Sequence, residues 1–307
     1  MQRATRLMMF CAGLALLGAT ACETADPNSA AYWIEKLKGD NPKAAVRKLG
    51  EIDSPEATDA LVAYYKEGRF RYDIVAALTR KGDHKAVPVL VEALQDTQEP
   101  KAAQLAASTL LEWKAGEGYT DTYVAVISNA SAPNENRYGA LQILAANPDP
   151  KATQPLLAIL KSDPDIVPIV MIGLAAEALG KLGAEEAIPG LIRCLWLDDA
   201  LGRNEVAACR LALNRVGPAK AVPKLIQTLE RKNRTVEQRA RKYKFDLGGI
   251  VEAKTAEMLG DMPDPSAVDP LIKALTTSDQ MPPSIANDPK KAQVFVMSGV
   301  QKVISVA

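Results

Sequence analysis

The sequence is poor in several residue types on which functional sites depend. Its 307 residues include one histidine and four cysteines, and aromatic residues make up only 5% of the chain. A single histidine excludes a metal centre built from several histidines. The 37 Lys and Arg residues balance the 37 Asp and Glu residues, so no overall field attracts nucleic acid or an acidic membrane. Hydrophobic residues still make up 48% of the chain, which is enough for a core of alanine and leucine.

The familiar motifs of active sites are also missing. The chain has no glycine-rich phosphate loop, no nucleophile elbow and no cysteine pair at metal-binding spacing. His84, the single histidine, lies in the segment GDHK, where an exposed turn residue is the simplest interpretation. We therefore expect a protein that is not an enzyme and that uses no metal and no cofactor.

The uncharged run at the N-terminus is too short to cross a membrane comfortably. Residues 1–6 carry two arginines, and residues 7–21 are uncharged, whereas a membrane-spanning helix needs about 20 apolar residues. A basic start, an apolar middle and small residues at the end are typical of a secretory signal. We interpret residues 1–21 as a signal peptide and residues 22–28 as a short tether.

A repeat runs through most of the remaining chain. Leucines recur at intervals of 29, 33, 33, 35, 34 and 46 residues, a near-constant period that is typical of stacked-repeat proteins. Apolar or small residues follow each of these leucines by eight, twelve and sixteen positions, so seven units share one register. The 46-residue interval contains an insertion. The repeated leucines are Leu49, Leu78, Leu111, Leu144, Leu179, Leu213 and Leu259.

Each unit is predicted to consist of a helix, a short turn and a second helix. Apolar residues four positions apart form one stripe of an α-helix. Aspartate or serine in the turn can accept hydrogen bonds from unpaired amides at a helix N-terminus. The fold class is therefore all-α. Prolines mark the starts of the second helices, because a missing amide hydrogen costs little there: Pro88, Pro155, Pro189, Pro223 and Pro270.

One unit carries a family resemblance. Residues 179–192, LGKLGAEEAIPGLI, resemble the HEAT repeat in its bacterial HEAT-like form, and the likeness covers residues 40–307. It implies an α-solenoid, a superhelix of about seven helix-turn-helix repeats with a long concave surface. Unit three departs from the pattern, because Tyr119, Tyr123 and Ile127 replace the usual alanine and leucines. The single histidine also excludes the HEAT-like deoxyhypusine hydroxylases, whose di-iron site needs several His-Glu pairs.

The two ends of the array lie outside the seven units. Tyr32, Trp33, Ile34 and Leu37 fall on one side of a helix predicted between Ser29 and Gly39, which we interpret as an N-terminal cap. Residues 29–307 would then form one solenoid domain with an incomplete eighth repeat. The sequence stops on an apolar stretch of that repeat, so we expect either a longer array or an end that another subunit covers.

Cys22 is the candidate site of a membrane anchor. It follows Ala19-Thr20-Ala21, which resembles a bacterial lipobox, and the resemblance implies that Cys22 is lipidated. Acyl chains then tether the protein to a membrane. The alternative is ordinary cleavage after Ala21, which leaves a free thiol. In either case we expect export, and with lipidation a lipoprotein of the bacterial cell envelope, at the outer membrane or the periplasmic face.

The second helices supply the candidate partner surface. In HEAT solenoids these helices line the concave face, so the resemblance implies a role there for exposed side chains. Burial in the core is the alternative for the aromatic members. The candidate partner-binding residues are Tyr64, Trp196, Lys224, Gln227 and Lys273.

The insertion before the last unit has an excess of basic residues. One interpretation is an arm that binds an anionic lipid headgroup, a cell-wall polymer or an acidic protein. The other is a solvated helix with its Lys and Arg side chains turned outward. No nucleic-acid recognition motif accompanies the charges, and we expect no nucleic-acid partner. The patch comprises Arg234, Arg239, Arg241 and Lys242.

Cys194 and Cys209 fall on consecutive predicted helices, where other units carry small residues. Two interpretations stay open, namely small buried thiols and a disulfide formed in an oxidising compartment.

Together these features predict a non-catalytic scaffold of the cell envelope that holds protein partners and takes no small-molecule substrate. Two alternatives are an enzyme or subunit similar to the HEAT-like phycobilin lyases and a purely structural envelope spacer. Export argues against the first, because pigment attachment is cytosolic.

Overall fold

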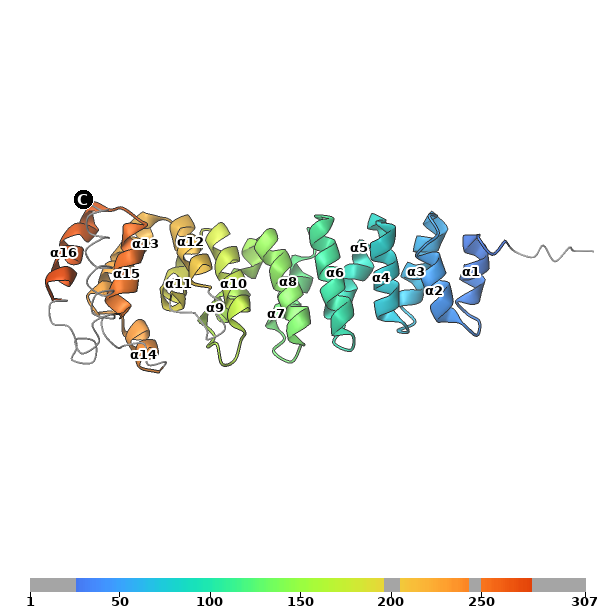
Figure 1. The fold of residues 1–307 in the computed structure, drawn as a ribbon, viewed down its shortest axis with the longest axis horizontal. Helices are drawn as coiled ribbons and strands as arrows, with labels where there is room; N and C mark the ends of the chain where they lie inside the picture. The colour runs from blue at the N-terminus through green and yellow to red at the C-terminus, as the bar shows by residue number, and fades with distance from the viewer. Residues whose placement is uncertain (1–25, 196–204, 243–249, 278–307) are drawn as a thin grey trace, which may run out of the picture. The chain divides into compact units, whose positions relative to one another are not determined.

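A computed structural model describes residues 26–195, 205–242 and 250–277 (Figure 1). These residues form sixteen α-helices and four short 3-10 turns, and they contain no strand. The predicted all-α, α-solenoid fold class is therefore confirmed. No helix in the described ranges is long and apolar enough to cross a membrane. The described residues divide into two compact bodies, unit 1 up to Ala86 and unit 2 from Val87. These two units are distinct from the seven repeats, and each is described by itself.

Unit 1 begins with the helix that lies outside the repeat register. This helix, α1, packs against α2 and α3. Its N-cap is Ser29, whose hydroxyl accepts from the amide of Tyr32 at 3.3 Å, and the Trp33 indole donates to the carbonyl of Pro27 at 2.7 Å. The unit comprises α1 (Ala30–Lys36), α2 (Pro42–Leu49), α3 (Pro55–Tyr65), α4 (Arg71–Lys81) and the turn η1 (His84–Ala86).

The helix ends in unit 1 follow the turn chemistry that the sequence indicates. Asn41 and Ser54 cap α2 and α3 by accepting from amides three residues on. Gly82 ends α4 with a φ of +68°, a left-handed conformation that side chains disfavour. The Lys81 ammonium, at the end of α4, donates to the carbonyl of Ile52 beyond α2 and so links successive repeats.

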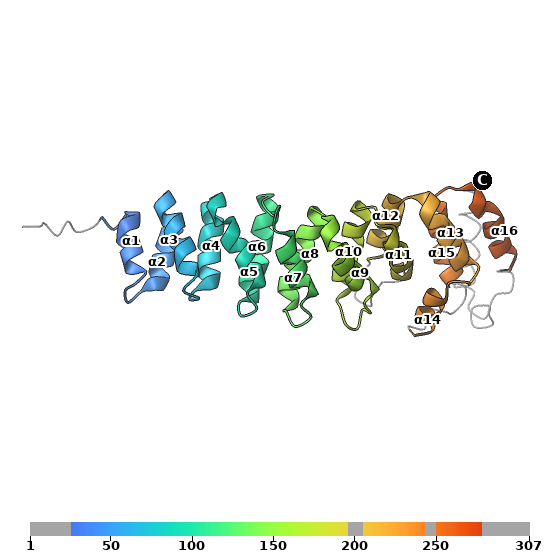
Figure 2. The ribbon, with the colours of Figure 1, turned by 180° about the vertical axis from the view of Figure 1, so that it is seen from behind.

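Unit 2 stacks its helices in two layers, and Figures 1 and 2 show from opposite sides how they follow one another in chain order. The first helices of successive repeats pack side by side, from α6 through α8 and α10 to α12. They are α6 (Pro100–Glu112), α8 (Asn134–Ala146), α10 (Ile169–Lys181), α12 (Val206–Val216) and α15 (Ile250–Gly260).

The second helices form the other layer of unit 2. Each contacts the next along the chain, and α13 contacts α16. Four of them directly follow a 3-10 turn in the chain: α5 follows η1, and the other three follow η2 (Pro150–Ala152), η3 (Glu185–Ala187) and η4 (Pro265–Ala267). The second helices are α5 (Val87–Gln95), α7 (Thr120–Ser128), α9 (Thr153–Lys161), α11 (Ile188–Cys194), α13 (Pro218–Leu229) and α16 (Val268–Thr277).

The predicted register corresponds to seven helix pairs in the described residues. Six of the seven repeated leucines are fully buried. The exception is Leu111 of the third repeat, where Leu110 takes the buried position. Tyr119 is half-buried where the other repeats bury an alanine. The prediction for Pro223 is wrong: α13 begins a turn earlier at Pro218, and Pro223 lies inside it, because this repeat has a continuous α-helix in place of a 3-10 turn.

Close backbone contacts hold the first helices together. A Cβ atom built on Gly180 of α10 would lie 2.6 Å from the Cα of Ala212 on α12. A Cβ on Gly139 of α8 would lie 2.7 Å from the Cβ of Ala107 on α6. Because a side chain at either glycine would have no room, these positions fix how near the neighbouring helices approach.

The predicted insertion contains an extra helix, α14 (Arg234–Lys242). It packs against α11, the second helix of the fifth repeat, although it follows the sixth repeat in the chain. Val236 and Ala240 are buried on its inner side. The helix therefore docks on the repeat array.

Candidate functional site

The second-helix layer of unit 2 presents side chains at one recurring position. This position lies fourteen residues after each repeated leucine, and we call its six occupants in unit 2 the second-helix row. All of them are exposed except Arg193, which is half-buried. Since the second helices pack side by side, their outer positions form a continuous surface. The row comprises Glu92, Ala125, Ala158, Arg193, Gln227 and Lys273.

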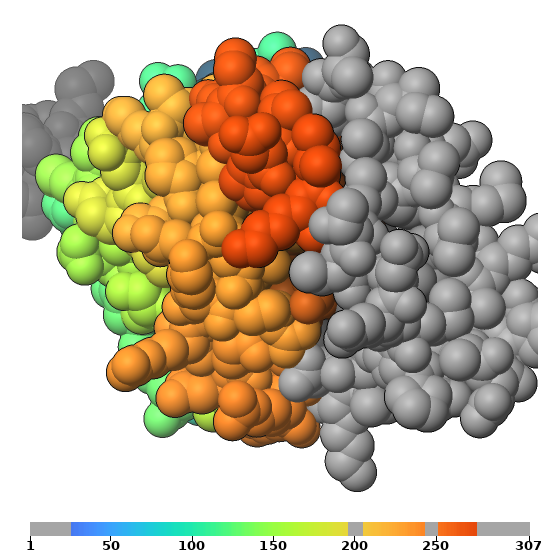
Figure 3. Space-filling view, turned by 90° about the vertical axis from the view of Figure 1, so that its left-hand side faces the viewer, coloured from blue at the N-terminus to red at the C-terminus, as the bar shows by residue number. Residues whose placement is uncertain are grey.

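Three of the predicted partner-binding residues lie together at one end of this layer. Lys224 and Gln227 are exposed on α13, and Lys273 is exposed on the adjoining α16. Figure 3 views this end of unit 2 and shows the surface of α16 (red) beside that of residues 205–242 (orange). Tyr64 is half-buried on α3 in unit 1. Trp196 and Cys22 lie outside the described residues.

The charge of the layer changes along the stack. Glu92 stands near its start, whereas Lys224 and Lys273 stand near its end, where Asp269 of α16 is also exposed. Lys224 is exposed and forms no ion pair with a carboxylate of the described residues. A hydrogen bond from Lys232, with smaller Coulombic contributions from Lys232 and Lys273, lowers the pKa of Glu230. This end of the layer therefore offers a cation that is free to meet an acidic group.

The half-buried member of the row has a structural task. The Arg193 guanidinium donates to the carbonyl of Leu160 at 3.2 Å and to that of Ser162 at 3.5 Å, at the end of α9. It thus satisfies carbonyls that have no partner inside their own helix. Asn136 does the same for α5, since its amide nitrogen donates to the carbonyls of Leu94 at 2.9 Å and Asp96 at 3.0 Å.

The basic patch is only partly exposed. Arg234, Arg241 and Lys242 are exposed on α14. Arg239 is 6% exposed, and its guanidinium lies 3.3 Å from a carboxylate oxygen of Asp163, in the loop between α9 and α10. Arg239 is therefore not part of an exposed patch, contrary to the sequence-based expectation, because its stem packs into the repeat array and its charge is paired there.

Asp163 joins two basic residues of α14 to the array. The Lys242 ammonium donates to Asp163 at 2.7 Å and lies 3.6 Å from Asp165. This hydrogen bond, followed by the charges of Lys242, Arg239 and Arg193, lowers the pKa of Asp163. The carboxylate thus stays charged, and two of the four patch residues serve to dock α14.

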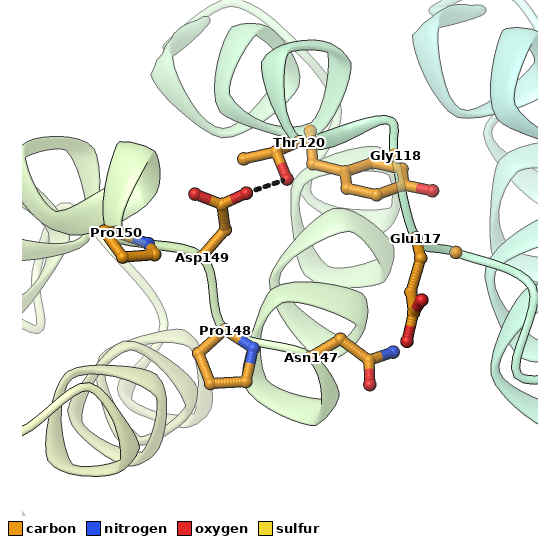
Figure 4. Close-up of a pocket in the computed structure, with 9 residues that line it drawn as sticks. Glu117, Gly118, Thr120, Asn147, Pro148, Asp149 and Pro150 are labelled. Carbon is orange, nitrogen blue, oxygen red and sulfur yellow. Dashed lines mark hydrogen bonds between the residues drawn. The ribbon is translucent and has the colours of Figure 1, made fainter.

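A pocket of about 440 Å³ lies where the third repeat departs from the repeat pattern (Figure 4). One side is the start of α7 at Thr120 and the turn before it, with Glu117 and Gly118. The other side is the start of η2 at Pro150 and the turn before it, with Asn147, Pro148 and Asp149. The Thr120 hydroxyl donates to Asp149 at 2.8 Å across the pocket.

Two titratable groups of this pocket have pKa values that are shifted away from neutral pH. A hydrogen bond from the amide of Lys151, followed by that from Thr120, lowers the pKa of Asp149. Burial raises the pKa of Tyr123 to about 12, and the nearby Tyr119 adds to the effect. A carboxylate that stays charged and a phenol that stays neutral do not form an acid–base pair near neutral pH. We therefore attribute the pocket to the altered packing of the third repeat.

Clusters suited to metal binding do not occur in the described ranges, where no group of three His, Cys, Asp or Glu residues comes together. His84 is exposed in η1, as the sequence predicts.

Antiparallel helix pairs that stack in series define an α-solenoid repeat protein. The sequence profile of the HEAT-repeat family matches residues 33–111 and 121–210, which is more than half of the chain. The chain therefore belongs to the HEAT-repeat family. No curated protein matches it. Proteins of this family are typically non-catalytic helical scaffolds for protein interactions, and the second-helix layer is the part of this chain that fits such a role.

The sequence did not reveal the contacts of Asn136 and Asp163, and it revealed only two members of the second-helix row, Gln227 and Lys273. Asn136 and Asp163 act on repeats other than their own, so neither has a local signal. The register could have identified the second-helix row in advance, because its members share one position in every unit.

Proposed function

We propose that the chain is exported, is anchored in the bacterial cell envelope by a lipid on Cys22, and holds a protein partner on its second-helix layer without catalysing a reaction. Residues 1–22 support the anchor through their likeness to a lipoprotein signal. Membership of the HEAT family supports the scaffold role. The observation that carries the proposal is the series of second helices with exposed side chains at one repeated position.

The partner expected at the α13–α16 end has an acidic surface. Lys224 is exposed there without an acidic partner in the described residues, Lys273 lies on the adjoining helix, and Gln227 adds an amide that donates and accepts hydrogen bonds. Opposite charges across an interface raise the association rate and select the partner.

Charge reversal on α13 tests this surface. Capture from detergent-solubilised envelope is expected to recover at least about tenfold less partner with the variant Lys224→Glu/Gln227→Glu than with the wild-type chain, because like charges then face each other. Quantitative mass spectrometry of the captured proteins measures the change.

The chain offers a matched control for this experiment. Lys101 and Gln104 are also exposed and three residues apart, but they lie on the first helix α6. Lys101→Glu/Gln104→Glu is expected to capture as much partner as wild type. Equal losses in both variants would count against the second-helix layer, and the absence of any saturable partner would favour a purely structural spacer.

The anchor has its own test. Cells that express the full chain are grown with a labelled fatty acid, and wild type is compared with Cys22→Ser. We expect the label and the membrane association to disappear in the variant, because the thiol that carries the acyl groups is gone. Label that persists in Cys22→Ser would reject lipidation at this residue, whereas an unlabelled but exported wild type would indicate ordinary signal cleavage.

A further inference from the structure

Two thiols that the scaffold role leaves unexplained lie inside unit 2. Cys194 is the last residue of α11, and Cys209 lies on α12. Both are free and fully buried, and their helices pack against each other. They are therefore held at one helix contact.

The two thiols influence each other across this contact. Each contributes to the pKa shift of the other, and the Cys194 thiol donates to the carbonyl oxygen of Leu160 on α9 at 3.6 Å. Cysteines held at one helix contact can form a disulfide once a local movement brings their Cβ atoms to about 4 Å.

The charges around the pair differ between the two thiols. The hydrogen bond from Cys209, with help from Arg239 and Arg193, lowers the pKa of Cys194 despite its burial. The hydrogen bond to Cys194 and burial raise the pKa of Cys209 well above its usual range, and Glu205 acts in the same direction. Cys194 is therefore the first of the two to become a thiolate, and the thiolate is the form that reacts.

We propose that Cys194 and Cys209 are an oxidisable dithiol that closes to a disulfide joining α11 to α12, with a small or protein disulfide as the oxidant. The Cys194 thiolate attacks the oxidant, forms a mixed disulfide and releases one thiol. Cys209 then loses its proton and attacks the Cys194 sulfur, which releases the second thiol. Two electrons and two protons pass to the oxidant.

The burial of both thiols determines when this reaction occurs. An oxidant reaches Cys194 only when the α11–α12 contact opens or before it forms, so closure is slow in the folded protein and fast during refolding. Once formed, the bond closes the loop between residues 194 and 209. Because it restricts the unfolded chain, it is expected to raise the melting temperature by roughly 5 °C.

Peptide mapping tests the proposal on the full chain with Cys11→Ser and Cys22→Ser, so that one cysteine pair remains. The chain is refolded with oxidised glutathione, alkylated and digested with trypsin without reduction. Cleavage after Arg193, Arg203 and Arg210 puts the two cysteines on separate peptides, 194–203 and 204–210. We expect one linked species, two hydrogen atoms lighter than the sum of the peptides.

Adding Cys209→Ser provides the matched control, in which Cys194 carries glutathione or the alkyl label and the melting temperature does not rise. Two results would overturn the proposal: a folded, oxidant-treated chain in which both cysteines still take the label after denaturation, or disulfides that form only between chains. The experiment does not depend on the scaffold role, because it needs no partner and no membrane.

Discussion

Replacing Gly180 with leucine is expected to lower the free energy of unfolding by more than about 3 kcal/mol, which is the upper end of the usual cost of overpacking a core. A Cβ at this position would lie 2.6 Å from the Cα of Ala212 and 2.7 Å from its Cβ. A backbone atom cannot turn away as a flexible side chain can. The helices α10 and α12 must therefore separate, and the apolar contacts between them are lost along their length.

Alanine at the same position separates two effects. Gly180→Ala adds the clashing Cβ, but it also gains about 1 kcal/mol because alanine favours a helix over glycine. We therefore expect it to be less destabilising than leucine, by about 2 kcal/mol. Denaturant unfolding followed by circular dichroism measures both variants.

Gly39 provides the control for this substitution. It lies after α1 without a positive φ, and a Cβ there makes an ordinary 3.5 Å contact with the Lys36 carbonyl oxygen. Gly39→Leu is expected to change the free energy of unfolding by no more than about 0.5 kcal/mol. If Gly180→Leu were equally mild, the close contact of α10 with α12 would not be a determinant of the stack.

Removing the carboxylate of Asp163 is the second change with a large expected effect. Asp163→Ala leaves the guanidinium of Arg239, whose side chain is 5% exposed, without the 3.3 Å carboxylate contact. Breaking a buried pair in this way costs about 3 to 5 kcal/mol. Because the Asp163 side chain is itself 32% exposed, water screens part of the interaction, and we expect about 2 kcal/mol. Hydrogen exchange at the amides of α14 measures the loss of docking.

Two further variants show whether the buried charge is the cause. Asp165→Ala is the matched control, since Asp165 is 67% exposed and lies 3.6 Å from Lys242, and its expected effect is below about 0.5 kcal/mol. Adding Arg239→Met to Asp163→Ala is expected to restore most of the stability, because the buried charge that lost its Asp163 contact is then absent. A double variant as unstable as Asp163→Ala alone would contradict this explanation.

The lowered pKa of Asp163 also predicts that the stability of the protein depends on pH. The pKa of Asp163 is lowered in the folded protein, mainly by the Lys242 hydrogen bond. The contribution of Asp163 to stability is therefore fully present above its pKa in the unfolded chain, about 3.9. This contribution is lost as the pH falls through the lower pKa that Asp163 has in the folded protein. The difference in stability between wild type and Asp163→Ala is therefore expected to shrink in acid.

Much of the fold follows from local patterns in the sequence. The repeated leucines identified seven helix pairs because a helix stripe and a turn signal need only residues within about four positions of each other. The capping roles of Ser54, Asp149 and Asp264 were equally predictable, since each binds an amide two or three residues away. Pro223 was misplaced because a first-turn proline and a proline one turn later look alike in sequence.

The candidate surface was predictable only in part. The sequence predicted that Gln227 and Lys273 lie on second helices, and the structure puts their helices in contact. The burial of Arg239 was not predictable, because its partner Asp163 lies 76 residues earlier in the chain.

By itself, the sequence determined that this chain is a series of amphipathic helix pairs in one register, because that information is local and repeats. Only the tertiary structure decided how near α10 approaches α12, that α14 docks through Asp163, and that Cys194 and Cys209 are buried at one helix contact. Each of these depends on residues from different repeats, whose distance is set by the packing of whole helices and leaves no periodic trace in the chain.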